Sequence, residues 1–289
     1  MPRIEHILAL TAALIGAAGT VCIQRGLRGS DAYTGFWVNL VVGTVGLWVG
    51  VALTGGIGRV SASSVAYFVL AGFVGTFAGR LLRYVSIDKV GASIATALLN
   101  LNPMFAALLA IALLGEHVTL PLMAGTVVIV TGTILLSMRG SRLDFRPRHI
   151  VYPILSAACF GIVTVFRKLG LAHMGPVVGS AINVTTAMIA FTAFLVASGR
   201  GWTASCRGRS LAYFIAAGAA ENTSVFLNVF ALSMGAVSVV APLYGTAPIF
   251  VLFLSFFFLR GIDVLNARVV AGTLLIVAGV GLITALGGR

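Results

Sequence analysis

A single carboxylate lies in the middle of an apolar run in the second half of the chain. Glu221 is the eleventh of the 22 residues from Leu211 to Leu232, and Ser224 and Asn228 follow at spacings that share one helix face. A carboxylate at the centre of a bilayer costs at least about 2.5–3.5 kcal/mol, so it usually faces a cavity or a partner. Such a group can bind an ammonium or exchange a proton with the solution. The alternative is a protonated Glu221 that bonds an asparagine and serves helix packing only.

The corresponding span of the first half has Gly75 in the place of Glu221 and carries its first cation five residues further on. Arg80 follows Thr76 by four residues and precedes Arg83 by three, so the three side chains share a helix face. The planar fork of an arginine suits a carboxylate, and Arg80 together with Glu221 would therefore hold a zwitterion. Two alternatives stay open: Arg80 and Arg83 snorkel to the membrane surface, or Arg80 and Glu221 form a structural ion pair.

Other polar and aromatic residues could complete a binding site. Prolines inside a span free a backbone carbonyl and permit bending, whereas aromatic residues form walls or, near helix ends, interfacial anchors. The further candidates are Asn39 and Asn183 at matched positions, Asn100 and Asn102, Asn222 beside Glu221, the aromatic residues Trp37, Tyr84 and Tyr244, and the hinge prolines Pro103 and Pro248.

Several other classes of chemistry lack the residues that they need. The 3 cysteines and 4 histidines are scattered without metal-ligand spacing, and no phosphate-binding loop or nucleophile–base constellation is visible. The net charge of +12 comes from arginines in short connections, not from a basic soluble domain. We therefore expect no metal, no cofactor, no enzymatic activity and no nucleic-acid partner.

The elements that must position these residues are membrane-spanning helices. The 289 residues are 59% hydrophobic and 9% charged, against about 25% charged in soluble proteins. Ten continuously apolar blocks have about the length that crosses a bilayer. They run approximately over residues 4–23, 32–54, 65–86, 90–114, 119–137, 150–166, 174–198, 211–232, 236–259 and 265–286.

The chain repeats itself at an offset of 144 to 146 residues. The stretch AYFVLAG at 66–72 matches AYFIAAG at 212–218, Gly16 matches Gly161, and Pro103 matches Pro248. This predicts an all-α protein with a five-helix repeat at 1–140, a basic linker at 141–149 and a second repeat at 150–289. Because five is odd, the halves would enter the membrane from opposite sides and enclose a central cavity.

Loop charges predict the orientation. With Arg80 and Arg83 set aside, twelve Lys and Arg residues follow odd-numbered blocks and five lie on the other side, among them Arg167 and Lys168. The positive-inside rule then places both termini outside the cytoplasm. The protein itself is expected in a plasma membrane or a bacterial inner membrane.

One segment of each half carries a family resemblance. PMFAALLAIALLGEHVTLPLMAGTVVIVTGTILL, from Pro103 to Leu136, resembles the end of the EamA-like domain in the drug/metabolite transporter superfamily, and the second half repeats it from Pro248. There Asp263 and two extra residues replace Gly115-Glu116, so any role of that glutamate does not transfer to the second half. The resemblance implies a ten-helix secondary carrier, of a kind that includes amino-acid exporters.

We therefore expect a secondary active transporter that exports an amino acid or related zwitterion by alternating access. Glu221 is the candidate proton-coupling residue. The alternatives are uptake or exchange of a sugar, nucleoside or organic anion, and, in a different class, a membrane scaffold or lipid-handling subunit. The expected partners are a small-molecule substrate, the lipid bilayer and protons, and the protein is expected to be a monomer or a homodimer.

Overall fold

The described part of the chain is helical throughout. The computed structural model describes residues 3–58, 60–90, 98–116, 119–137, 147–198, 208–258 and 267–286, and no strand occurs among them. The first half contains α1 (Ile4–Gly26), η1 (Leu27–Gly29), α2 (Ala32–Leu53), α3 (Ala62–Ala71), η2 (Gly72–Gly79), α4 (Arg80–Val90), α6 (Asn102–Leu114) and α7 (Leu120–Ser137). The second half contains η3 (Pro147–Ile150), α8 (Val151–Gly170), α9 (Pro176–Ala197), α10 (Arg209–Met234), α11 (Val237–Tyr244), α12 (Ala247–Phe258) and α13 (Ala267–Leu286).

The helices have the length and the surface of a multi-pass membrane protein. Six described segments are long and apolar enough to cross a membrane, and shorter apolar helices occupy the other four predicted blocks. Their outward faces carry large apolar side chains, including Leu53 (82% exposed) and Leu120 (80% exposed). Soluble monomers rarely expose such continuous apolar surface, whereas lipid favours it.

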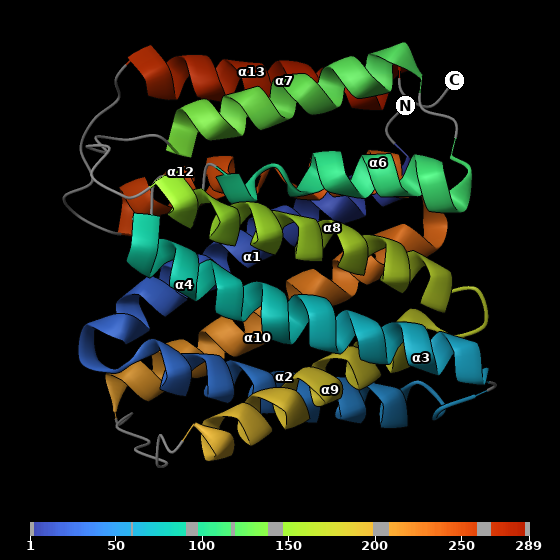
Figure 1. The fold of residues 1–289 in the computed structure, drawn as a ribbon, viewed down its shortest axis with the longest axis vertical. Coiled ribbons are helices and arrows are strands. Elements are labelled where there is room, and N and C mark those ends of the chain that lie inside the picture. Colours follow the sequence, from blue (N-terminus) through green and yellow to red (C-terminus); the bar gives the residue numbers. More distant parts are fainter. Residues whose placement is uncertain are drawn as a thin grey trace.

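Helices of the two halves pack in matched pairs. Figure 1 shows α7 beside α13 at the top and α2 beside α9 at the bottom of the stack. The first helix of each half also packs against the third helix of the other, as α1 with α10 and α8 with α3 and η2. Each pairing has a counterpart in which the two halves are interchanged, as an approximate two-fold axis between them requires.

A phenylalanine slot repeats this relation in atomic detail. In each half, a fully buried phenylalanine of the third predicted block occupies space that two glycines of the other half leave open. The slots are formed by Phe68 with Gly170 and Gly179, and by Phe214 with Gly26 and Gly35. Corresponding members are 144 or 146 residues apart, so the sequence repeat is also a repeat of contacts.

Helices α2 and α9 run antiparallel. The indole N–H of Trp37 donates to Thr192 Oγ1 at 3.3 Å, and that of Trp48 donates to Thr185 Oγ1 at 2.9 Å. As the residue number on α2 rises from 37 to 48, the number of its partner on α9 falls from 192 to 185. The second helices of the two halves therefore point in opposite directions, as the predicted inversion requires.

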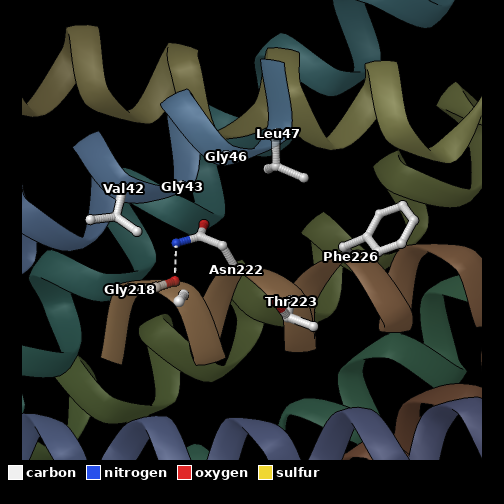
Figure 2. A pocket seen from close by; sticks show the side chains of 9 residues that line it. Val42, Gly43, Gly46, Leu47, Gly218, Asn222, Thr223 and Phe226 are labelled. Atoms are coloured by element: carbon white, nitrogen blue, oxygen red, sulfur yellow. Dashed lines mark hydrogen bonds between the residues drawn. The ribbon is translucent and has the colours of Figure 1, made fainter. Parts of the chain in front are cut away.

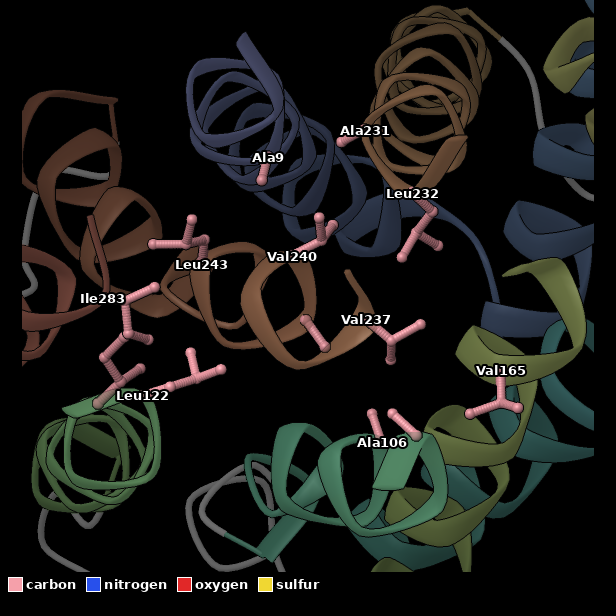
Figure 3. Packing of buried hydrophobic residues seen from close by; sticks show 13 residues of the cluster. Ala9, Ala106, Leu122, Val165, Ala231, Leu232, Val237, Val240, Leu243 and Ile283 are labelled. Carbon is pink, nitrogen blue, oxygen red and sulfur yellow. The ribbon is translucent and has the colours of Figure 1, made fainter. Parts of the chain in front are cut away.

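Helix α11 lies at the centre of the largest apolar cluster. Figure 3 shows Val240 directed toward α1 and α10, Val237 toward α6 and α8, and Leu243 toward α7 and α13. All three residues are fully buried. A helix that presents apolar side chains in several directions belongs in the interior, and here both halves contribute to the shell around it.

Two predicted spans are interrupted at matched positions. Helix α6 begins at Asn102 and α12 at Ala247, so Pro103 and Pro248 lie in the first turn of a helix and not inside a continuous one. The two interruptions meet, because a Cβ on Gly245 would lie 2.9 Å from Cγ of Pro103. This corrects the predicted position of the hinge prolines.

The sixth predicted block ends too early. It was expected to end near Phe166, but α8 continues to Gly170 and includes Arg167 and Lys168. These two cations therefore belong to a helix of the bundle and not to a loop.

The slot for Phe214 predicts a matched pair of substitutions on α2. Gly35→Ala places a methyl group 2.6 Å from the Phe214 ring, whereas Gly46→Ala meets nothing within 4 Å. Overpacking costs about 1–3 kcal/mol, and replacing a helix glycine by alanine returns up to about 1 kcal/mol. We expect Gly35→Ala to lower the melting temperature of the detergent-purified protein and Gly46→Ala to leave it equal or higher. Equal melting temperatures for the two variants would contradict the slot.

Candidate functional site

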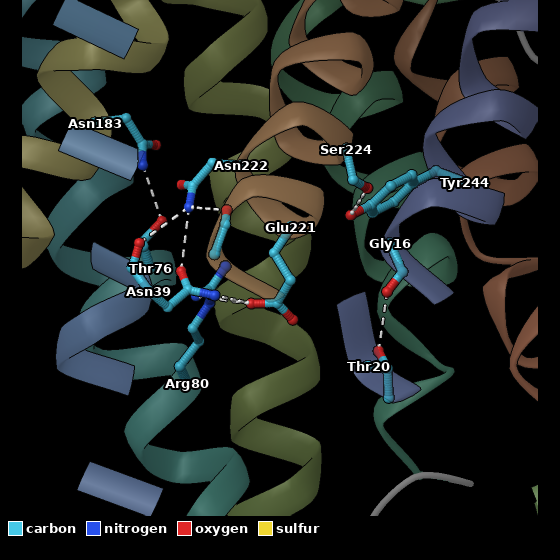
Figure 4. Close-up of polar contacts among 11 residues, drawn as sticks. Gly16, Thr20, Asn39, Thr76, Arg80, Asn183, Glu221, Asn222, Ser224 and Tyr244 are labelled. Atoms are coloured by element: carbon cyan, nitrogen blue, oxygen red, sulfur yellow. Dashed lines mark hydrogen bonds and ion pairs between the residues drawn. The ribbon is translucent and has the colours of Figure 1, made fainter. Parts of the chain in front are cut away.

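A carboxylate, a guanidinium and an amide meet where the two halves join. Oε2 of Glu221 on α10 accepts a hydrogen bond from Nδ2 of Asn39 on α2 at 2.6 Å, and it lies 3.5 Å from Nη1 of Arg80 on α4. Nη1 of Arg80 also donates to Oδ1 of Asn39 at 3.5 Å, which closes a triangle (Figure 4). Arg80 thus points into the bundle and its guanidinium carbon lies 5.3 Å from the centre of the Phe36 ring.

Asn222 holds Asn39 in place from the neighbouring position on α10. Its Nδ2 donates to the Gly218 carbonyl at 2.7 Å, to the Asn39 carbonyl at 3.1 Å and to Asn39 Oδ1 at 3.2 Å. A Cβ at Gly43 would overlap the Asn222 amide, so that glycine is needed for the close approach of α2 and α10.

The second half supplies the matching asparagine. Nδ2 of Asn183 on α9 donates to Thr76 Oγ1 on η2 at 2.9 Å, just as Asn39 on α2 bonds Glu221 on α10. Each asparagine therefore joins the second predicted span of its own half to the third of the other. The symmetry fails in the acceptor, which is a carboxylate on one side and a hydroxyl on the other.

A π-helix positions Thr76 and Arg80. The segment η2 widens the helix for eight residues between α3 and α4. A Cβ at Gly72 would overlap the Asn183 carbonyl and one at Gly75 would overlap Val163, so these glycines let α9 and α8 lie against the widened turn. Arg83 is exposed, so the cation facing the bundle is Arg80. π-Segments occur frequently at functional sites.

Arg167 joins the cluster from α8. Its Nε donates to Asn183 Oδ1 at 3.3 Å, and Arg80 and Tyr244 are close enough to act on it electrostatically. Our sequence analysis had assigned Arg167 to a loop. The repeat offset contained the missed signal, because it aligns Arg167 with Cys22, which lies inside the first predicted span.

Ser224 and Tyr244 lie on the α1 side of Glu221. Ser224 Oγ donates to the Ala12 carbonyl at 2.6 Å and lies 3.4 Å from the Tyr244 hydroxyl (Figure 4). A Cβ on Gly16 would lie 2.7 Å from Ser224 Oγ, so this contact also depends on a glycine.

The remaining candidates lie in other settings. Trp37 belongs to the α2–α9 contact, and Asn228 is buried on α10 with no hydrogen bond to its Oδ1 from the described residues. Asn102 begins α6 and donates to the Leu99 carbonyl at 3.1 Å, and Asn100 lies in the preceding turn. The side chains of Tyr84 and Pro248 lie outside the described residues.

A separate pocket of about 230 Å³ lies between α2 and α10. Figure 2 shows Val42, Gly43, Gly46 and Leu47 on one side and Gly218, Asn222, Thr223 and Phe226 on the other. The pocket has a mainly apolar lining, and the lining residues Ala219 and Thr223 are exposed on the outer face of α10. Neither Arg80 nor Glu221 lines it, and Asn222, which bonds Asn39, lies between the pocket and the charged cluster.

Two further charged residues, Glu116 and Lys168, bond backbone groups where α10 ends and α11 begins. Glu116 accepts bonds from the backbone N–H groups of Val237 and Ser238 at 2.8 and 2.9 Å and from Ser238 Oγ at 2.6 Å. Nζ of Lys168 donates to the carbonyls of Leu232 and Gly235, both at 2.7 Å. The anion thus caps the beginning of α11 and the cation caps the end of α10, as the helix dipoles favour.

Together these features define a multi-pass helical membrane protein with a charged centre between two related halves. The model of the EamA-like transporter family matches residues 3–138 and 148–285, and the chain belongs to this family. It is therefore a membrane transporter of small molecules, and the predicted family resemblance is confirmed.

The structural comparison supports the fold alone. A solved crystal structure, described only as that of a protein, aligns with a TM-score of 0.82 over 99% of this chain and 98% of its own. The two sequences are 16% identical over that alignment. No curated protein matches the sequence.

The cap on α11 predicts a stability loss at a site far from Glu221 in sequence. Glu116→Gln removes the charge and leaves one N–H of α11 without its acceptor, which costs about 1–3 kcal/mol. The control is Glu5→Gln, because Glu5 faces the exposed Arg3 at 3.9 Å and such pairs contribute about 0–1 kcal/mol. We expect thermal denaturation to show a clear loss for Glu116→Gln only, and equal losses would refute its capping role.

Proposed function

We propose that this protein is a secondary active transporter that exports an amino acid or a related zwitterion by alternating access. The observation that carries the proposal is the triangle of Arg80, Glu221 and Asn39, whose helices belong to both halves. A substrate bound there touches both halves at once. Relative movement of the halves can then expose it to one side of the membrane and then to the other.

The chemistry of the triangle suits a zwitterion. Arg80 and Glu221 leave 18% and 16% of their side-chain surfaces accessible, so neither is fully enclosed and a ligand can reach both. A substrate carboxylate would bind the guanidinium, and a substrate ammonium would bind the carboxylate. The ion pair would be the resting state of the site, with each partner satisfied by the other until the substrate arrives.

Glu221 is also the proposed proton carrier. It is the described carboxylate nearest the middle of a predicted span, and Asn39 Nδ2 donates to it at 2.6 Å. Protonation would end its attraction for both Arg80 and a substrate ammonium. Proton binding and substrate release would therefore be coupled at the carboxylate of Glu221.

Alternating access requires that one end open while the other closes. We propose ten spans in two inverted halves, with the meeting of Pro103 and Gly245 as the pivot and the Glu116 cap as the closure of one end. The loop charges support non-cytoplasmic termini in a plasma or inner membrane. Removing Arg167 and Lys168, which lie within α8, from that count reduces the smaller side from five cations to three.

Transport by reconstituted protein tests the proposal. Proteoliposomes are loaded with a mixture of the standard amino acids, and efflux is followed by mass spectrometry with and without a proton gradient. Losing a charged hydrogen-bonding partner costs about 1.5–3 kcal/mol, so Glu221→Gln and Arg80→Gln should each lower kcat/KM about 10- to 100-fold. Arg83→Gln is the matched control, since Arg83 is exposed on the same helix, and its flux should equal wild type.

Three outcomes would count against the proposal. If no amino acid showed protein-dependent flux, amino acids would be rejected as the substrate class. Gradient-dependent flux that persists in Glu221→Gln would remove this residue from coupling. An equal loss in Arg80→Gln and Arg83→Gln would show that the effect is not specific to the triangle.

A further inference from the structure

The charges at the centre of the bundle do not balance. Arg80 and Glu221 compensate each other at 3.5 Å, but Arg167 reaches the same network through Asn183 and brings a second positive charge. Asn183 also bonds Thr76, which lies four residues before Arg80, and Arg80 is close enough to Arg167 to act on it electrostatically. Arg167 is only partly accessible on its own surface.

The described carboxylates offer Arg167 no counter-charge. The structure describes four carboxylate side chains, and each of them contacts another group. Glu5 lies 3.9 Å from Arg3, Asp31 caps α2 through Thr34, Glu116 caps α11, and Glu221 pairs with Arg80. Asn183, which accepts the bond from Arg167, is neutral.

A partly desolvated guanidinium without an anion is unfavourable, and an anion that arrives with the substrate removes the penalty. Among the described side chains, the network without substrate contains two cations and one anion. A zwitterion leaves this excess unchanged, whereas a substrate with one more carboxylate cancels it.

We propose that Arg167 binds a second acidic group of the substrate, so that the transported compound is a small amino acid with net charge −1. The α-carboxylate binds Arg80, the ammonium binds Glu221, and the side-chain carboxylate binds Arg167. This inference rests on the proposed function and narrows its substrate class. It makes Arg167 a specificity-determining residue that sets the preference for acidic over neutral substrates.

Glutamate and glutamine form the matched test pair, because they share size and zwitterionic head and differ by one negative charge. Full-length protein in proteoliposomes is assayed for counterflow of each labelled compound. A charge-assisted hydrogen bond in a partly buried site corresponds to at least about a tenfold preference for glutamate in KM. In Arg167→Gln the ratio should fall to about one, mainly through a higher KM for glutamate. Arg167→Lys should keep part of the preference and Arg83→Gln all of it.

A second variant separates recognition from folding. Asn183→Asp leaves Arg167 in place and gives it an internal carboxylate at the atom that already accepts its hydrogen bond. The glutamate preference should then fall toward one, even if Arg167→Gln is unstable in size-exclusion chromatography.

The other outcomes overturn the inference. They are equal KM values for the two compounds in wild type, a preference for glutamine, transport of neither compound, or an unchanged ratio in Asn183→Asp. Flux of glutamine or another neutral amino acid that depends on Glu221 but not on Arg167 would leave the proposed function intact. A complete absence of amino-acid flux would remove both.

Discussion

The constraint on which this structure depends is that a charge inside an apolar bundle is costly unless a polar or charged group bonds it. Glu221 finds Asn39 and Arg80, Lys168 finds the last carbonyls of α10, and Glu116 finds the first N–H groups of α11. None of these contacts is local in sequence. Each contact therefore holds together segments that the hydrophobic effect would not hold together in a membrane. Lipid tails are as apolar as leucine side chains, so an apolar helix gains little by leaving lipid for another apolar helix.

Glycine makes these contacts sterically possible. Gly43 leaves room for the Asn222 amide, Gly72 for the backbone at Asn183, and Gly16 for Ser224. In each case the polar group reaches its partner only because a neighbouring helix lacks a side chain at the point of approach. At these three positions, close packing and polar satisfaction are thus one requirement.

Much of this arrangement could be predicted from the sequence, and the reasons for the rest are physical. Hydropathy located the helices, and the repeat identified Asn39 and Asn183 as equivalents, because both signals are local or periodic. The position of Arg167 in the bundle was missed, because an arginine at the end of an apolar block is typical of a loop anchor unless the repeat offset is applied to it. The interruptions before Pro103 and at Gly245 were also missed, since the apolar composition continues through both.

The resemblance to the EamA-like domain contained a Gly-Glu turn whose purpose the sequence left open, and the structure supplies a physical one. Gly115 ends α6 with φ of 64°, a left-handed conformation that glycine adopts without strain, and this turn directs Glu116 at α11. The second half has Asp263 in the corresponding segment, outside the described residues. The Glu116 cap ties the end of α6 in one half to the start of α11 in the other, so this turn serves the contact between the two halves.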